Sequence, residues 1–265
     1  MKILILIKQV PETSNVKMDE ETGTMIRAGS ESIINPLDLY AIEIGIQLKE
    51  EFGGEITVIT MGPPSAEKAL REAIAMGCDD GILLSGKEFA GSDTWATSYA
   101  LSQLIKKQDE YDLVLAGERA TDGDTGQVGP GIASFLDIPL STYTSKILKT
   151  TDKSIIVERL VEEGYETLKL PLPALLTVVK EISYPRLPTL SGKQRAKKIE
   201  LKNHTSENVK MDKANLGLKG SPTRVVKISH PKVTRNGEFV KIEDKGSSKK
   251  AVERLLEFLQ EKEIV

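Results

Sequence analysis

The 265-residue sequence has one cysteine, Cys78, and only two histidines, His204 and His230. A single cysteine cannot form an intramolecular disulfide, so a reducing, cytoplasmic compartment is expected. No Cys/His cluster has the spacing of metal ligands, and a Ser-His-Asp or Cys-His hydrolase is hard to build from two histidines. The GxSxG motif is missing too, which makes a hydrolase of the α/β type remote.

Long apolar runs and a charge excess are also missing. The five apolar residues Ile3–Ile7 fall short of a secretory core of roughly 7–15 residues or a membrane-spanning helix of about 20. The chain has 36 basic and 39 acidic residues, with no block of one sign in the first 190. Bulk charge therefore favours neither nucleic acid nor a membrane surface as a partner.

The first half of the chain alternates four times between strand and helix patterns. Ile3–Ile7 is rich in β-branched residues and suits a strand buried on both faces. Asn35 is expected to cap the first helix and Ser65 the second. The predicted strands cover 3–7, 55–61, 81–84 and 111–116, and the helices 36–52, 66–76, 94–107 and 127–136. This order predicts an α/β fold with a doubly wound, mostly parallel sheet.

The second half departs from this rhythm. Further strands, partly hairpins, are predicted over 145–149, 155–161, 166–170 and 174–179, and a small hairpin near the start joins 16–18 to 24–26. Residues 183–245 have few apolar runs and no core pattern. Helix 246–262, capped by Ser247 or Ser248, has an apolar face that needs covering. The tail is therefore either loose or an arm that wraps a partner.

The strongest local signal is the loop Gly117–Gly129, between a buried strand and a helix. Gly123 and Gly126 permit positive φ and a close approach of the backbone. The helix start that follows attracts anions, so phosphates are assigned to the backbone near Thr125–Val128. Asp122 and Asp124 would repel a phosphate that they faced, and receive orienting roles. The spacing matches neither GxGxxG nor a Walker loop, and a solvated Asp/Gly turn remains the alternative.

A second polar helix start, with Gly91, Asp93 and Thr94, is predicted at the same edge of the sheet. In open parallel sheets, ligands bind outside the carboxyl ends of the strands, which lie at this edge. Asn35 and Asp38 can also reach this edge. For Asn35, capping alone competes with capping plus ligand contact. Trp95, the only tryptophan, is either a core anchor or part of a pocket wall.

Several separated motifs resemble one known family. They are Ile7-Lys8-Gln9-Val10-Pro11, Ile34-Asn35-Pro36, the stretch DGDTGQVGP at 122–130, the pattern from Val157 through Arg159, Glu162-Glu163-Gly164, Glu166 and Leu168 to Pro173–Thr177, and Pro185–Leu190 followed by Ala196-Lys197-Lys198. Together they cover nearly the whole chain and are similar to the β subunit of electron-transfer flavoproteins.

The resemblance implies an electron-carrier subunit in a heterodimer with an FAD-binding α subunit. Its fold would be the adenine-nucleotide-binding (α-hydrolase-like) type of sheet with an extended C-terminal arm. The β subunit of such proteins holds either AMP or a second FAD. Members with two FAD bifurcate electrons from NADH to ferredoxin or flavodoxin and, through the α-subunit FAD, to a flavin dehydrogenase of the acyl-CoA or lactate type. The DGDTGQVGP form and Gly91–Ser98 resemble these members, with a non-bifurcating AMP subunit as the alternative.

The resemblance also implies site residues and a division of the chain. Residues 1–182 would bind the nucleotide, 183–200 would recognise a partner, and 201–265 would form the arm and helix that wrap the α subunit. Leu190 matches the apolar anchor that docks the dehydrogenase. The predicted cofactor-binding residues are Ile7, Lys8, Asn35, Asp38, Met61, Gly62, Gly91, Asp93, Thr94, Gly117, Asp122, Gly123, Asp124, Thr125, Gly126, Gln127, Val128 and Gly129. A stand-alone nucleotide-sensing module with the same sheet is the competing class.

Overall fold

The computed structural model describes residues 1–12, 17–18, 25–26, 32–108, 110–226, 239–242 and 244–264. The chain divides into two compact units, Met1–Val226 and Lys227–Val265. Within the described ranges, no helix combines the length and the apolar character needed to cross a bilayer.

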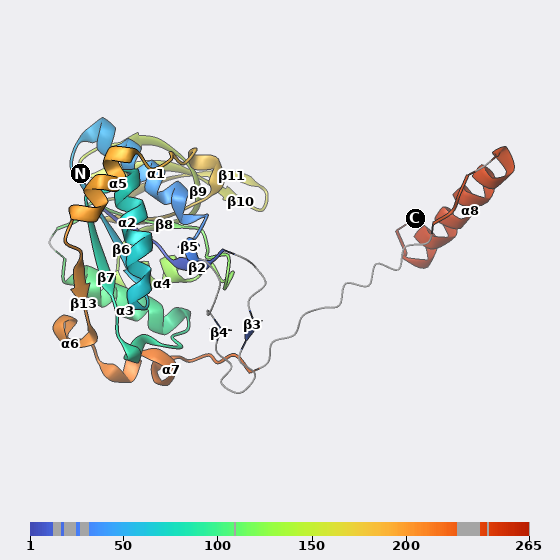
Figure 1. Ribbon diagram of the computed structural model, residues 1–265. Coiled ribbons are helices and arrows are strands. Elements are labelled where there is room, and N and C mark those ends of the chain that lie inside the picture. Colours follow the sequence, from blue (N-terminus) through green and yellow to red (C-terminus); the bar gives the residue numbers. More distant parts are fainter. Residues whose placement is uncertain are drawn as a thin grey trace. The chain divides into compact units, whose positions relative to one another are not determined.

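A nine-stranded sheet forms the centre of the first unit (Figure 1). Its spatial order is β11 (Gly164–Pro171), β10 (Ser154–Val161), β9 (Leu140–Thr150), β12 (Ala174–Val178), β8 (Leu113–Gly117), β1 (Lys2–Leu6), β6 (Glu55–Met61), β7 (Asp80–Leu84) and β13 (Lys202–His204). Neighbouring strands are parallel except in the pairs β9–β10 and β10–β11, which are antiparallel. The predicted α/β class with a mostly parallel sheet is confirmed.

Helices cover both faces of the sheet. One face carries α1 (Asp38–Phe52), α2 (Glu67–Met76) and α5 (Leu190–Lys198). The other carries α3 (Thr94–Lys106), α4 (Val128–Leu136) and the short helices α6 (Ser206–Val209) and α7 (Gly217–Gly220). Along β1, Ile3 and Ile5 join the first core and Leu4 and Leu6 the second. Burial of the strand on both faces explains its unbroken apolar sequence.

Short elements connect these layers. The 3₁₀ turns are η1 (Pro64–Ala66), η2 (Lys87–Phe89), η3 (Lys180–Ile182) and η4 (Lys213–Asn215). Two small antiparallel pairs join β2 (Gln9–Pro11) to β5 (Ser32–Ile34) and β3 (Lys17–Met18) to β4 (Met25–Ile26). The second pair confirms the small hairpin predicted near the start.

Helix boundaries follow the glycines, but the predicted caps were partly wrong. Gly53 and Gly77 end α1 and α2, as expected. Helix α1 begins at Asp38 without a capping side chain, so Asn35 is not its cap. Ser65 makes no capping bond either, because η1 leads directly into α2. Cys78 is buried after α2, and burial raises its thiol pKa to about 12, as suits an inert small side chain.

The expectation that 183–245 lacks core structure was wrong for its first part. Residues 183–226 belong to the first compact unit, where α5 packs on α2 and β13 extends the sheet. Helix α5 buries only one apolar side chain, Ala196, and docks instead through Arg195, whose Nη2 donates to the carbonyls of Ile74 and Cys78. Docking through hydrogen bonds to carbonyls at the end of a helix leaves no apolar periodicity to detect.

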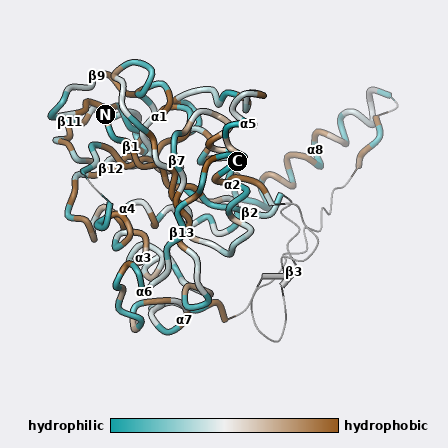
Figure 2. The backbone as a smooth tube through the Cα atoms, turned by 60° about the vertical axis from the view of Figure 1, so that its left-hand side comes forward, coloured by the Kyte–Doolittle hydropathy of each residue, from teal (hydrophilic) through white to brown (hydrophobic). Residues whose placement is uncertain are grey.

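The second unit contains α8 (Lys245–Glu261), which confirms the predicted terminal helix. Asp244 caps it and Ser247 completes the capping box, in place of the predicted serine cap. Along α8 the tube in Figure 2 alternates between hydrophobic and hydrophilic colours. Val252, Leu255, Leu256 and Phe258 are exposed.

Candidate functional site

The carboxyl ends of β1 and β8 lie side by side, because these strands pair in parallel. From β1 the chain continues through α1 to β6 on one side of this pair. From β8 it continues through α4 to β9 and β12 on the other side (Figure 1). Sheets whose connections diverge in this way bind ligands outside the strand ends at the point of divergence. Lys8, Asn35–Asp38 and the loop 117–129 all follow these two strands.

The side chain of Asn35 joins the start of α1 to the loop 117–129. It is fully buried, and its Nδ2 donates to Asp38 Oδ1 and to the carbonyl oxygen of Arg119, both at 2.9 Å. Its Oδ1 accepts from the backbone N–H of Thr121 at 3.1 Å. Both amide hydrogens are therefore bonded within the protein. The side chain holds the loop through Arg119 and Thr121 and does not cap a helix.

Asp38 lies beneath the same loop. Its Oδ2 accepts from the backbone N–H of Lys8 at 2.7 Å, and Asn35 and the N–H of Gly117 also donate to the carboxylate. Burial raises the pKa of Asp38 to about 7, although these three donors and the Lys8 charge act in the opposite direction. A Cβ on Gly117 would lie 2.4 Å from Asp38 Oδ1, so the strand can pass the carboxylate only with glycine there.

The two loop aspartates each pair with a cation. Lys8 Nζ lies 2.7 Å from Oδ1 of Asp122, whose side chain is only 7% exposed. Arg119 Nε lies 2.9 Å from Asp124 Oδ1. The negative charges of both aspartates are thus balanced by cations of the protein itself, one from the end of β1 and one from the loop.

The loop backbone bends at Asp124 and Gly126, with φ of +50° and +62°. Gly123 does not adopt a positive φ, so this part of the expectation was wrong. Asp124 takes the left-handed conformation instead, and its N–H donates to the carbonyl of Ala120 at 2.8 Å. Aspartate is one of the few residues other than glycine that tolerate this region.

Helix α4 starts directly after the bend and has nine residues. Its N-cap, Gln127, provides no capping side-chain bond. First-turn N–H groups have no acceptor within their own helix, so an uncapped start is suited to an anion. Gly129, in the first turn, is buried, and a Cβ there would lie 2.5 Å from Thr177 Cγ2. This glycine lets the helix approach β12.

The start of α3 is engaged elsewhere. Asp93 caps the helix through the N–H of Ala96 at 3.0 Å, and its Oδ2 accepts from Thr223 N and Oγ1 at 2.9 and 2.7 Å. Gly91 has φ of +73°, and a Cβ there would lie 2.5 Å from Leu218 Cγ. Of this trio only Thr94 reaches the loop, where its Oγ1 donates to Gln127 Oε1 at 3.1 Å.

The remaining predicted residues lie around this centre or apart from it. Ile7 and Met61 are at the ends of β1 and β6, and Gly62 N–H continues the sheet by donating to Leu84 O. Trp95 is 40% exposed and stacks on Tyr99, so it is no core anchor. Leu190 begins α5, outside the loop network, and is exposed.

Sequence reasoning missed Arg119 and Thr121, which tie the loop to Asp124 and Asn35. The single basic residue Arg119 among the acidic residues Glu118, Asp122 and Asp124 is the signal that could have indicated an ion pair inside the loop. In the part of the chain that the structure describes, no three His, Cys, Asp or Glu residues are placed to hold a metal ion.

A doubly wound sheet with a glycine-containing bend and an uncapped helix at its point of divergence defines a nucleotide-binding type of α/β protein. Comparison with known proteins gives the family. Residues 22–207 match the electron transfer flavoprotein domain. The electron transfer flavoprotein subunit beta of Thermoanaerobacterium thermosaccharolyticum is 49% identical over 266 residues, which cover 100% of both chains.

Two further relatives are named as subunits of larger complexes. The caffeyl-CoA reductase-Etf complex subunit CarD of Acetobacterium woodii is 47% identical over 243 residues, 91% of this chain and 92% of that one. The acryloyl-CoA reductase electron transfer subunit gamma of Anaerotignum propionicum is 41% identical over 272 residues, 100% of both chains. This chain therefore belongs to the β subunits of the electron transfer flavoprotein family, whose function is electron transfer.

Proposed function

We propose that this β subunit holds an FAD, with its pyrophosphate on the bend 122–129 and the first turn of α4. The observation that carries the proposal is the uncapped start of α4, which follows the left-handed Gly126 at the divergence of β1 and β8. Backbone N–H groups there are free of side-chain capping by Gln127 and suit a diphosphate.

The residues present fit an adenine nucleotide. Asp122 and Asp124 are paired with Lys8 and Arg119, so the backbone N–H groups set the local preference for an anion. Among the residues that the structure describes, and apart from Gly123 and its two chain neighbours, no heavy atom lies within 4 Å of where a Cβ on Gly123 would sit, which leaves room beside the bend. Open space supports FAD over AMP, because a flavin must extend past the pyrophosphate. An AMP-binding, non-bifurcating subunit is the alternative.

The division of labour follows from this placement. A bound FAD would supply both two-electron and one-electron redox chemistry, which bifurcation from NADH to ferredoxin or flavodoxin and to the FAD of the α subunit requires. The protein binds and orients: the network of Asn35, Asp38 and Asp122 fixes the bend, and α4 supplies donors. No side chain needs to act as a nucleophile in this scheme.

The proposed partners are an α subunit, joined in a heterodimer, and a flavin dehydrogenase of the acyl-CoA or lactate type. Relatives named as subunits of caffeyl-CoA reductase and acryloyl-CoA reductase complexes support both partners. The exposed Leu190 is proposed as the anchor for the dehydrogenase and α8 as part of the arm that wraps the α subunit. A cytoplasmic location is proposed with them.

Cofactor analysis of the co-purified heterodimer tests the proposal. Two FAD per heterodimer, and NADH oxidation that requires both ferredoxin and the dehydrogenase's acceptor, are expected. A content of one FAD and one AMP per heterodimer would instead support the non-bifurcating alternative. Absence of any adenine compound from the β subunit, with the α-subunit FAD retained, would refute nucleotide binding at the bend altogether.

A further inference from the structure

Residues 183–189, between η3 and α5, have no regular secondary structure but are held at both ends. Ser183 Oγ donates to the carbonyl of Tyr40 at 3.4 Å. The N–H of Thr189 donates to the carbonyl of Ala75 at 3.4 Å, and its side chain caps α5 through Gly192 N. Pro185 and Pro188 restrict φ between these points. The backbone of this segment is therefore pinned to α1, α2 and α5.

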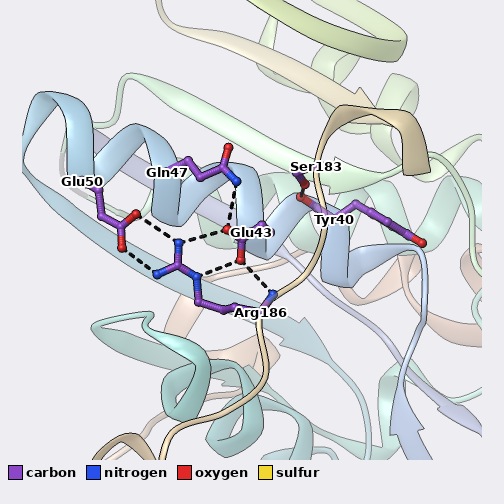
Figure 3. Close-up of polar contacts among 6 residues, drawn as sticks. All are labelled: Tyr40, Glu43, Gln47, Glu50, Ser183 and Arg186. Atoms are coloured by element: carbon purple, nitrogen blue, oxygen red, sulfur yellow. Dashed lines mark hydrogen bonds and ion pairs between the residues drawn. The ribbon is translucent and has the colours of Figure 1, made fainter.

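Arg186 is the central attachment of the segment (Figure 3). Its Nε donates to Glu43 Oε2 and its Nη2 donates to Glu43 Oε1, both at 2.9 Å. Its backbone N–H also donates to Glu43 Oε2, at 3.0 Å. Nη1 and Nη2 also donate to Glu50 at 2.6 and 3.0 Å. The guanidinium thus bridges two carboxylates that lie seven residues, or about two helical turns, apart on α1.

The pairing with Glu43 is a buried one. The Glu43 side chain is 4% exposed and also accepts from Gln47 Nε2 at 2.9 Å. Burial would raise the pKa of Glu43, but the bonds from Arg186 and Gln47 lower it overall. Lysine could not replace this planar, bidentate arrangement, which uses four guanidinium N–H groups.

The pinned segment and the first residue of α5 expose their large apolar side chains. Tyr184, Leu187 and Leu190 are 94%, 86% and 76% exposed. These three side chains therefore contribute little buried apolar surface to the core of this chain. Rigid backbone with unburied apolar groups is the arrangement that lowers the ordering cost of binding.

We propose that Arg186 is a positioning residue for dehydrogenase docking: by clamping Glu43 and Glu50 it presents Tyr184, Leu187 and Leu190 in the geometry that the partner binds. The inference rests on the proposed docking role of Leu190 and adds the residue that prepares this surface. Lys193, Lys197 and Lys198 on α5 are exposed in the same part of the chain. The fitting partner is a flavin dehydrogenase whose apolar pocket has acidic side chains at its rim.

Because Arg186→Met alone would leave a buried carboxylate unpaired, the test variant is the pair Arg186→Met and Glu43→Gln. Glu50→Gln is a milder variant that removes only the exposed half of the clamp. In the co-purified heterodimer, the pair is expected to raise the KM for the dehydrogenase about tenfold. Cofactor content and kcat at saturating dehydrogenase should stay unchanged. The probes are purified acyl-CoA-reducing flavoproteins of the caffeyl-CoA and acryloyl-CoA reductase types.

A mutant cycle that combines Leu190→Ala with the Arg186/Glu43 pair distinguishes the docking role of Leu190 from the positioning role of Arg186. If Leu190→Ala does not weaken docking, or neither probe reacts with the wild-type complex, the docking role fails and the inference with it. If Leu190→Ala weakens docking but the Arg186/Glu43 pair does not, only the role of Arg186 is refuted. If both weaken it and the effects add fully, Arg186 does not act through Leu190.

Hydrogen exchange provides a readout that needs no partner. The amides of Tyr184, Arg186, Leu187 and Leu190 should exchange faster in the Arg186/Glu43 pair, whereas those of α4 and the bend 122–129 should be unchanged. Equal protection of the segment in wild type and variant would overturn the clamp.

Discussion

At the scale of single residues, the carboxylate of Asp38 lies where the loop 117–129, the end of β1 and the start of α1 meet. Burial raises its pKa from 3.8 to about 7, so between these values the folded protein holds a proton that the unfolded chain does not. Its contribution to stability is complete below pH 3.8 and is lost as the pH rises through 7.

Asp38→Asn should therefore gain stability relative to wild type as the pH rises from 4 to 7.5. The relative change in the free energy of unfolding is expected to be on the order of 3 kcal/mol. Urea unfolding at several pH values measures it. Asp152→Asn, in the exposed turn between β9 and β10, is the surface control measured alongside it. A constant difference between Asp38→Asn and wild type would contradict the account.

Two loop glycines should respond differently to the same change. Gly117→Ala places a Cβ 2.4 Å from Asp38 Oδ1 and 2.8 Å from the backbone of Leu37, so strand and helix must separate. A loss of roughly 1–3 kcal/mol in stability and a lower adenine nucleotide content are expected. Gly123→Ala has open space and no positive φ, and should change stability by less than about 0.5 kcal/mol. Equal effects of the two variants in urea unfolding would refute the packing argument.

The sequence could predict residue types at the site better than their roles. The glycine- and aspartate-containing loop was found because such residues permit bends next to a helix start. The partners were not found, because Asn35 meets Arg119 and Thr121 across more than 80 positions of sequence. Likewise, nothing local decides that Asp124 and not Gly123 takes the left-handed conformation.

At the scale of elements, Asp93 connects two parts of the chain that the sequence did not link. It caps α3 and holds Thr223, close to the end of the first compact unit. Burial would raise the pKa of Asp93, but hydrogen bonds from Ala96 and Thr223 lower it overall.

Thr223→Val should remove the hydroxyl bond of this attachment while leaving the bond from the backbone N–H of residue 223 and the cap on α3 intact. Amides of 217–226 are expected to exchange several-fold faster, since one hydrogen bond to a charged group contributes about 1.5–3 kcal/mol and this one is partly exposed. Protection within α3 should not change. Thr223→Ser keeps the hydroxyl and is the matched control. Faster exchange throughout α3 in the valine variant would mean that the two contacts are not separable.

Elements whose apolar residues recur with a clear spacing could be predicted from the sequence. Elements that pack through polar contacts could not. Strand β6 was predicted at its observed bounds, since it combines β-branched residues with flanking glycines. Helix α5 was missed because Arg195 and not an apolar stripe attaches it to α2. Strand β13 has three residues, Lys202 to His204, which pair with β7 only once the sheet exists.

At the scale of the whole molecule, the two compact units differ in how far they bury their apolar side chains. The first has two cores, one on each face of its sheet. In the second, α8 is closed at its start by the Asp244–Ser247 capping box, yet Leu255 and Leu256 are 57% and 48% exposed. A helix with one uncovered apolar face gains stability by burying it against a partner.

Replacing Leu255 and Leu256 by serine should therefore weaken assembly with the α subunit and spare the first unit. Because both leucines are about half exposed, covering the rest of them contributes on the order of 1.5–3 kcal/mol in total, so the dissociation constant of the heterodimer should rise roughly ten- to a hundredfold. Sedimentation of the co-expressed subunits measures this, with Lys250→Ser on the same helix as the control. Since the Asn35–Asp38 network lies entirely within the first unit, nucleotide binding by the β subunit should survive the loss of assembly. An unaffected heterodimer would place the partner's contact elsewhere on this chain.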